Sequence, residues 1–292
     1  MSKAKALLEL TRLEHGLMLA IGVAVGALVA SGAFPPADKF ALTFLTALLL
    51  EASTFALNDY FDYDIDVRNR RADRPLVRGE LSRRTALVVF AALFPLGIVC
   101  SFFVNMTCFL IALLTAILAV VYDAVLKRQK LVGNFYIAYT MAIPFVFGAA
   151  AVQQGGGLSL GLSRPIIVIA LIAFLSGTGR EIMKDVQDVE GDRAVGVRSF
   201  ATALGTRGAL GFSSVFYLAA IAFSLLPFLE ASFAQYYLDY YYLMVVLVTD
   251  AMLAFTGISM ASRKAPNLRT HRALTLVAMF IGLIAFLVGA FH

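Results

Sequence analysis

Nine apolar stretches of membrane-spanning length divide this 292-residue chain, and they constrain its fold more than any other feature. Each is close to the roughly 20 residues that an α-helix needs to cross the hydrocarbon core of a bilayer. Backbone polar groups find no water there, so such segments fold as helices that satisfy their own hydrogen bonds. The stretches are Gly16 to Phe34, Phe40 to Leu57, Ala86 to Phe103, Thr107 to Tyr122, Leu131 to Val152, Ile166 to Met183, Ala209 to Leu229, Tyr240 to Met260 and Ala273 to Phe291.

The composition agrees with this pattern and leaves little for a soluble domain. Hydrophobic residues make up 60% of the sequence and charged residues 15%, far from the averages of soluble domains. We therefore predict an all-α integral membrane protein, with nine transmembrane helices around a central cavity and a cytoplasmic cap of interhelical loops. Residues 1–292 are expected to form a single transmembrane domain.

The basic residues predict how the chain is oriented in the cell membrane. All but two of the 24 lysines and arginines fall at the N-terminus or in alternate loops, and the exceptions are Lys39 and Arg164. By the positive-inside rule the N-terminus is cytoplasmic and, with nine spans, the C-terminus is outside. These loops account for the net charge of +5 and lack a nucleic-acid-binding motif, so the expected surroundings are membrane lipids rather than nucleic acid. No obligate protein partner is indicated.

One acidic spacing occurs twice, each time at the end of an apolar stretch on the cytoplasmic side. It gives Asp59, Asp62 and Asp66 early in the chain, and a second triad late. Steps of three and four residues keep the carboxylates of a set on one helix face, and Asn58 extends the first set. Hard oxygen donors grouped in this way suit Mg²⁺, which completes its shell with water and phosphate oxygens. The second triad is Asp185, Asp188 and Asp192.

Cationic side chains lie at the same level as these carboxylates. The loop from Asp66 to Arg84 holds seven arginines, and it is either a basic loop that contacts lipid head groups or a lid whose guanidinium groups bind diphosphate oxygens. Lys127 and Lys184 flank the same region. Metal, lysine and arginine could therefore surround one polyanion, and this side of the membrane is where the site is expected to open.

The two acidic segments resemble the paired motifs of the UbiA-type intramembrane prenyltransferases. Asn58 to Asp66, NDYFDYDID, with Arg74-Pro75-Leu76 and Gly79 after it, resembles the first motif, and Gly179 to Asp192, GREIMKDVQDVEGD, resembles the second. Within the family this wording is most similar to that of archaeal digeranylgeranylglyceryl phosphate synthases. The resemblance extends over almost the whole chain.

The resemblance implies an enzyme, a prenyltransferase that transfers an alkyl group other than methyl in archaeal ether-lipid (phospholipid) synthesis. A geranylgeranyl group would pass from an allylic prenyl diphosphate donor to a lipid-soluble acceptor, the hydroxyl of geranylgeranylglyceryl phosphate, with the help of two Mg²⁺ ions. Breaking the allylic carbon–oxygen bond leaves a highly charged diphosphate, so the protein has to neutralise that charge.

The same resemblance implies roles for individual residues. One Mg²⁺ would be held by Asn58, Asp62 and Asp66, and the other by Asp185, Asp188 and Asp192. The diphosphate oxygens would be bound by Arg12, Arg68, Lys127 and Lys184. Lys127 and Lys184 are thus expected to act in catalysis, and Tyr139 is expected near the reacting carbon, although ordinary helix packing also explains a tyrosine there.

Several alternatives stay open from the sequence. The second candidate is an aromatic acceptor, as in quinone, haem or chlorophyll biosynthesis, because the sequence indicates where diphosphate binds but not what attacks the allylic carbon. A transporter of divalent cations or anionic lipids would also cluster acids and bases, but transport sites tend to lie near the bilayer midplane. The roles of Glu51, Asp250 and His15, the donor chain length, the general base and the oligomeric state are not predicted. Five basic residues could bind an acceptor phosphate, and the last four of them could equally bind lipid head groups: Arg12, Arg263, Lys264, Arg269 and Arg272.

Overall fold

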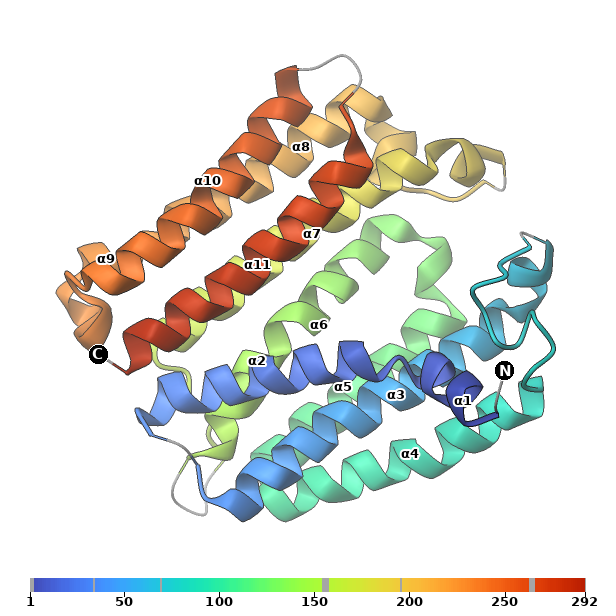
Figure 1. The fold of residues 1–292 in the computed structure, drawn as a ribbon, viewed down its shortest axis with the longest axis horizontal. Helices are drawn as coiled ribbons and strands as arrows, with labels where there is room; N and C mark the ends of the chain where they lie inside the picture. The colour runs from blue at the N-terminus through green and yellow to red at the C-terminus, as the bar shows by residue number, and fades with distance from the viewer. Residues whose placement is uncertain are drawn as a thin grey trace.

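A computed structural model describes residues 3–33, 35–68, 70–153, 158–194, 196–262 and 266–291. Within these ranges the chain forms helices and loops without a β-strand, and nine helical segments are long and apolar enough to cross a membrane. This confirms the predicted all-α, multi-pass architecture (Figure 1). The elements are α1 (Lys3–Thr11), α2 (Leu13–Ser31), α3 (Ala37–Arg68), α4 (Arg83–Val104), α5 (Met106–Ala124), η1 (Leu126–Arg128), α6 (Lys130–Ala151), α7 (Arg164–Ala194), α8 (Phe200–Ser224), α9 (Leu226–Leu229), η2 (Ala231–Tyr236), α10 (Tyr240–Ser262) and α11 (Leu268–Ala290).

Two helices are much longer than a bilayer requires. α3 has 32 residues and α7 has 31, or about 46–48 Å at 1.5 Å per residue, against a hydrocarbon core of about 30 Å. The apolar stretches predicted only the segments that end at Leu57 and Met183, whereas the helices continue to Arg68 and Ala194. Both acidic motifs therefore lie on helical extensions beyond the apolar spans.

The helices form two neighbouring groups that meet at α2, α6 and α7. In Figure 1, α1 to α6 (blue to green) lie on one side and α7 to α11 (yellow to red) on the other. α2 and α6 cross so closely that a Cβ atom at Gly26 would overlap the backbone of Phe145, and one at Gly148 would overlap the backbone of Val23. Small residues at such crossings let membrane helices approach without lipid between them.

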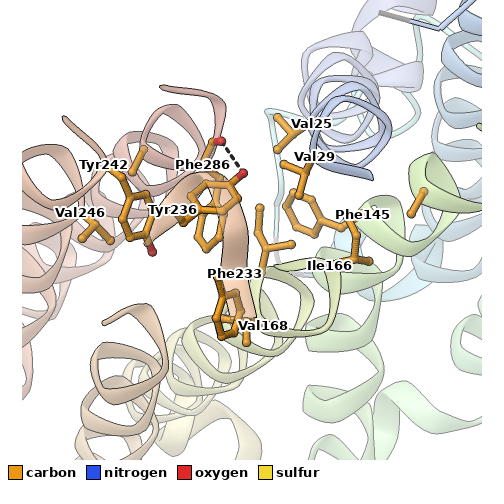
Figure 2. Packing of buried hydrophobic residues seen from close by; sticks show 13 residues of the cluster. Val25, Val29, Phe145, Ile166, Val168, Phe233, Tyr236, Tyr242, Val246 and Phe286 are labelled. Carbon is orange, nitrogen blue, oxygen red and sulfur yellow. Dashed lines mark hydrogen bonds between the residues drawn. The ribbon is translucent and has the colours of Figure 1, made fainter. Parts of the chain in front are cut away.

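A cluster of aromatic and branched side chains joins the groups at the end of the bundle opposite the acidic motifs (Figure 2). Tyr236 is fully buried and its hydroxyl donates a 2.9 Å hydrogen bond to the carbonyl of Phe286. The Tyr242 hydroxyl donates to the carbonyl of Ser224 at 2.6 Å. A buried phenol is stable in this position because its polar hydrogen has a partner, so the packing holds α7, α10 and α11 together away from the site.

The acidic end of α3 is covered by α1 and by the loop that leads to α4. A small apolar core, which includes Leu10, Ala56, Leu76 and Leu81, joins these elements. We call α1 and residues 70–82 the cap. α1 and α2 are separated at Arg12, whose φ of 43° lies in the left-handed region. Such a conformation is unfavourable for a residue with a side chain and persists only where its surroundings hold it.

Candidate active site

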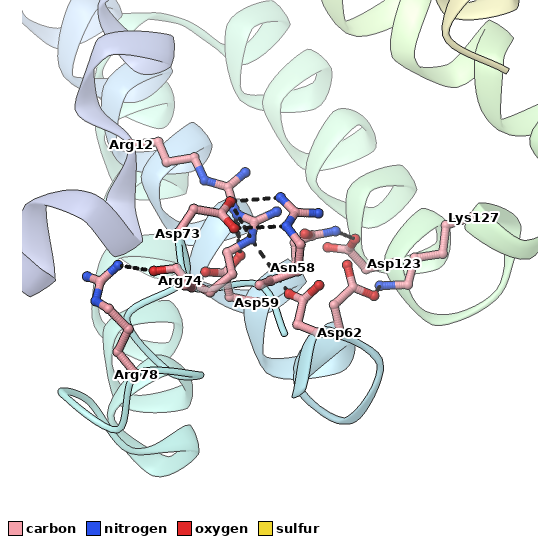
Figure 3. Close-up of polar contacts among 12 residues, drawn as sticks. Arg12, Asn58, Asp59, Asp62, Asp73, Arg74, Arg78, Asp123 and Lys127 are labelled. Carbon is pink, nitrogen blue, oxygen red and sulfur yellow. Dashed lines mark hydrogen bonds and ion pairs between the residues drawn. The ribbon is translucent and has the colours of Figure 1, made fainter. Parts of the chain in front are cut away.

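The first acidic set is bound to the cap through Asp59. This carboxylate is only 2% exposed, and its Oδ1 accepts from Arg12 Nη2 at 2.6 Å and lies 3.1 Å from Arg74 Nη1 (Figure 3). Arg74 Nε also lies 3.6 Å from Asp66 Oδ2. The strained backbone at Arg12 thus places its guanidinium group against α3. Arg12, which the resemblance assigns to diphosphate, is here the counterion of a buried carboxylate.

Asn58 and Asp62 face α5 and the segment after it. The Asn58 side-chain amide donates to Asp123 Oδ1 at 2.7 Å, and the Lys127 ammonium pairs with Asp62 (Figure 3). Asp123 lies at the end of an apolar stretch, four residues before Lys127, and that position is the signal that could have pointed to it. By binding the amide nitrogen, Asp123 fixes the orientation of Asn58.

The second acidic set converges on one cation. Lys130 Nζ lies 3.8 Å from Asp185 Oδ1, 3.6 Å from Asp188 Oδ2 and 3.0 Å from Asp192 Oδ1. Asn134, one turn further along α6, donates to Asp185 Oδ2 at 2.7 Å. Sequence reasoning missed both α6 residues; their i, i+4 spacing at the start of an apolar helix was the available signal.

Lys127 and Lys130 bring the two sets together. They are three residues apart, at most about 11 Å along an extended chain, yet Lys127 pairs with the set on α3 and Lys130 with the set on α7. The acidic ends of the two long helices therefore lie on either side of one short segment.

The donor set fits a divalent cation, although the carboxylates are not arranged as a metal cage among the described residues. Their oxygens are directed at lysine and arginine nitrogens instead. Three carboxylates around one ammonium mark a point where positive charge is strongly favoured, and carboxylate and amide oxygens are the ligands that Mg²⁺ takes. Asp192 Oδ2 is also buried without a hydrogen-bond partner in the part of the chain that the structure describes.

The remaining predicted residues differ in their surroundings. Lys184 Nζ donates to Glu181 Oε2 at 2.6 Å, so it is partnered within α7. Arg68 is exposed at the last residue of α3. The Tyr139 hydroxyl hydrogen-bonds Thr115 Oγ1 at 2.8 Å on α5. Arg272 donates to the side chain of Gln187 at 2.7 Å, whereas Arg263 and Lys264 lie outside the described residues.

Two apolar cavities lie within the helix bundle. One, of about 90 Å³, lies between α2, α3, α5 and α6 and is bordered by Glu51 and Tyr136. The other, of about 160 Å³, lies between α2, α6, α7, α8, α10 and α11 and is bordered by Arg180 and Asp250. Leu19 and Pro144 line both. The arrangement combines carboxylates and cations at one end of the bundle with apolar space inside it, as a site for an amphiphile with an anionic head requires.

Comparisons with known proteins agree with this geometry. The model of the UbiA prenyltransferase family matches residues 19–284. A digeranylgeranylglyceryl phosphate synthase of Archaeoglobus fulgidus is 44% identical over 98% of this chain and 96% of its own length. A solved structure described as a digeranylgeranylglyceryl phosphate synthase in membranes has 29% identity and a TM-score of 0.81, and covers 100% of this chain and 99% of its own. A UbiA homologue from Archaeoglobus fulgidus bound to DMAPP and Mg²⁺ shares the fold, with a TM-score of 0.61, 20% identity and coverage of 97% and 99%.

Proposed function

Because this chain belongs to the UbiA prenyltransferase family, we propose that it transfers a geranylgeranyl group from an allylic diphosphate to the hydroxyl of geranylgeranylglyceryl phosphate. The observation that carries the proposal is the placement of two carboxylate sets on either side of Lys127 and Lys130, above apolar cavities. A 44% identical relative that acts as a digeranylgeranylglyceryl phosphate synthase supports the choice of acceptor.

The site is suited to the departure of diphosphate. Asn58, Asp62 and Asp66 would hold one Mg²⁺, and Asp185, Asp188 and Asp192 a second. The bound ions supply positive charge to the leaving group when the allylic carbon–oxygen bond breaks. Lys127 and Lys130, which pair with these carboxylates, are placed to bind diphosphate oxygens. Arg68 and Lys184 would contribute at the edge of the site.

The allylic cation forms on the apolar side of these charges. Tyr122 and Tyr136 stack with ring centroids 4.7 Å apart between the acidic end and the first cavity. Tyr139 lies beyond Tyr136, at a centroid distance of 6.4 Å. Aromatic faces attract cations and an apolar wall keeps water away from them. This row of rings is therefore where the reactive end of the prenyl chain would lie.

The orientation of the chain in the membrane is part of the same proposal. The acidic ends of α3 and α7 lie beside the arginine-rich loops, which by the positive-inside rule face the cytoplasm. The N-terminus and the site would then be cytoplasmic and the C-terminus outside. Both helix groups contribute to the site, so residues 1–292 would act as one transmembrane prenyltransferase domain.

Product analysis tests this function directly. Purified protein is incubated with Mg²⁺ and geranylgeranyl diphosphate, together with either geranylgeranylglyceryl phosphate or 4-hydroxybenzoate, and the products are identified by mass spectrometry. We expect the doubly prenylated glyceryl phosphate, and no product when the metal is chelated. A prenylated benzoate alone would move the enzyme to the aromatic-acceptor group, and the absence of any transfer would remove the proposal.

A further inference from the structure

Two of the buried polar atoms beside the site that lack a hydrogen-bond partner in the described part of the chain belong to neighbouring residues. They are Arg180 Nε and Glu181 Oε1, from consecutive residues of α7. The Glu181 side chain is 7% exposed and that of Arg180 is 15% exposed, and Arg180 Nη1 lies 3.7 Å from Glu181 Oε1. Buried donors and acceptors are nearly always hydrogen-bonded, so an unpaired donor beside an unpaired acceptor calls for a ligand that offers both.

The pair is held firmly in place. Glu181 Oε2 is already bound by Lys184 Nζ at 2.6 Å, which leaves only Oε1 free to accept. The preceding residue, Gly179, packs against α8, where a Cβ atom would come within 3.1 Å of both Ser213 and Tyr217. The Ser213 hydroxyl donates to the Gly179 carbonyl at 2.6 Å. α7 therefore cannot rotate at this point without loss of packing.

The pair also lies between the acidic sets and the second cavity. Glu181 is one helical turn before Asp185 on α7. Arg180 lines the second cavity, whose other lining side chains are mostly apolar. A molecule bound here would have its polar end near the reacting centre and an apolar chain between α7, α8, α10 and α11.

Resting on the proposed function, we propose that Arg180 and Glu181 form the acceptor site: Arg180 binds the acceptor phosphate, and Glu181 accepts the hydrogen of its hydroxyl. A glyceryl phosphate matches the two unpaired atoms, because an anionic oxygen meets the guanidinium donor and a hydroxyl a few bonds away meets the carboxylate. The prenyl chain of the acceptor occupies the second cavity, which leaves the first for the donor.

The assignment gives the reaction a proton acceptor. The allylic carbon–oxygen bond of the donor breaks and its electron pair leaves with the diphosphate. The acceptor oxygen forms the new ether bond to the allylic carbon, and the hydroxyl proton passes to Glu181 Oε1. Lys184 stabilises the carboxylate before the transfer, and the proton is later released to water. Atoms and charge balance without any further reactant.

Two substitutions separate these roles. Glu181→Gln retains an oxygen for Lys184 but cannot take a proton, so kcat for transfer should fall by about 10²- to 10⁴-fold, the usual contribution of a general base. Arg180→Gln should raise KM for geranylgeranylglyceryl phosphate by about 10- to 100-fold, as expected for loss of a charged hydrogen bond, and should abolish any preference for it over geranylgeranylglycerol. Glu190→Gln and Arg193→Ala, at exposed positions of α7, are the matched controls.

Hydrolysis of geranylgeranyl diphosphate without acceptor distinguishes this role from a structural one. It should persist within about threefold in both variants, since neither residue is assigned to the donor. Equal loss of hydrolysis and transfer in Glu181→Gln, or unchanged transfer, would overturn the assignment, as would a rise in donor KM in Arg180→Gln. If the unaltered enzyme yields no product with geranylgeranylglyceryl phosphate, the proposed function fails and this assignment fails with it.

Discussion

The two acidic sets have the same spacing but different surroundings. On α3 three cations are divided among the carboxylates: Arg12 and Arg74 bind Asp59, Arg74 also lies near Asp66, and Lys127 pairs with Asp62. On α7 three carboxylates share a single lysine, Lys130. The spacing determines only which residues share a helix face. The neighbouring elements decide whether that face meets several cations or one.

Exposure separates single residues rather than the two sets. Asp59 in the first set and Asp185 in the second are each 2% exposed, whereas the Asp188 side chain is 61% exposed. The cap contributes Arg74 to the first set, with Arg12 at its hinge, whereas the start of α6 lies beside the second. Asp59 is therefore also a structural anchor for the cap, whereas Asp188 is open to solvent.

The largest expected effect is a loss of turnover, and it should be similar for the two sets. Asp62→Ala and Asp188→Ala each remove a proposed metal ligand, and turnover should fall by about 10³-fold or more, because a bound metal contributes several kcal/mol to charge stabilisation. Initial rates with saturating Mg²⁺ measure this. Asp64→Ala, at an exposed position that pairs with Arg83, is the control. Full activity in both variants would remove the two-metal proposal.

The comparison predicts that stability depends more on Asp59 than on Asp188. Asp59→Asn removes a buried counterion of Arg12 and Arg74, and should lower the free energy of unfolding by about 3 kcal/mol, as when one partner of a buried ion pair is removed. Asp188→Asn, at an exposed position, should change it by less than about 0.5 kcal/mol. Unfolding in detergent monitored by circular dichroism provides both values. Equal losses would mean that the two positions are anchored alike.

Removal of the lysines tests how each set responds to metal. Without Lys130 three carboxylates repel one another until a divalent cation replaces the ammonium, so Mg²⁺ should raise the unfolding temperature of Lys130→Met more than that of the unaltered protein. The corresponding difference in stabilisation free energy between this variant and the unaltered protein should be about 1–2 kcal/mol. Lys127→Met exposes one carboxylate, Asp62, to such replacement and should respond less. The unfolding temperature of each variant is measured with Mg²⁺ and with chelator. A larger Mg²⁺-induced rise in Lys127→Met than in Lys130→Met would contradict the prediction.

The smallest expected effect concerns the cap, which covers only the first set. The hydrogen bond from Arg78 lowers the pKa of Glu80 below its ordinary value. A carboxyl with a lowered pKa stabilises the fold above its unfolded-state pKa of about 4.3, and that contribution is lost as the pH falls through the folded-state pKa. Proteolysis of the cap loop should therefore accelerate as the pH falls below about 4, and less steeply in Glu80→Gln. Identical profiles would exclude this pair as the cause.

Much of the architecture follows from the sequence because it depends on local patterns. Apolar length predicted nine spans, and the three- and four-residue steps from Asn58 to Asp66 predicted a shared helix face, since both rules hold within one segment. The apolar runs did not reveal that α3 and α7 continue as helices beyond the apolar spans. Hydropathy indicates which residues can contact lipid, but it does not indicate where a helix ends.

The partners of the acidic residues were less predictable. More than 20 lysines and arginines fall on the predicted cytoplasmic side of the membrane, and only the packing of the helices decides which of them reaches a carboxylate. In the charge pattern Lys130 is only one of many basic residues, yet it lies at the centre of the second set. Asp123, Asn134 and the Arg180–Glu181 pair were missed for the same reason: each acts through a residue on another helix or through a cavity. The diphosphate roles of Arg12, Arg68, Lys127 and Lys184 stay predictions.

The length of α3 and α7 has a consequence for how the proposed reaction ends. Because the acidic sets lie beyond the apolar spans of these helices, the released pyrophosphate would pass directly into water, whereas the ether product has two hydrocarbon chains and stays dissolved in the membrane. The two products thus leave into different solvents. Each product diffuses away in its own phase. The reverse reaction then lacks one of its two reactants at the site, so prenyl transfer proceeds in one direction.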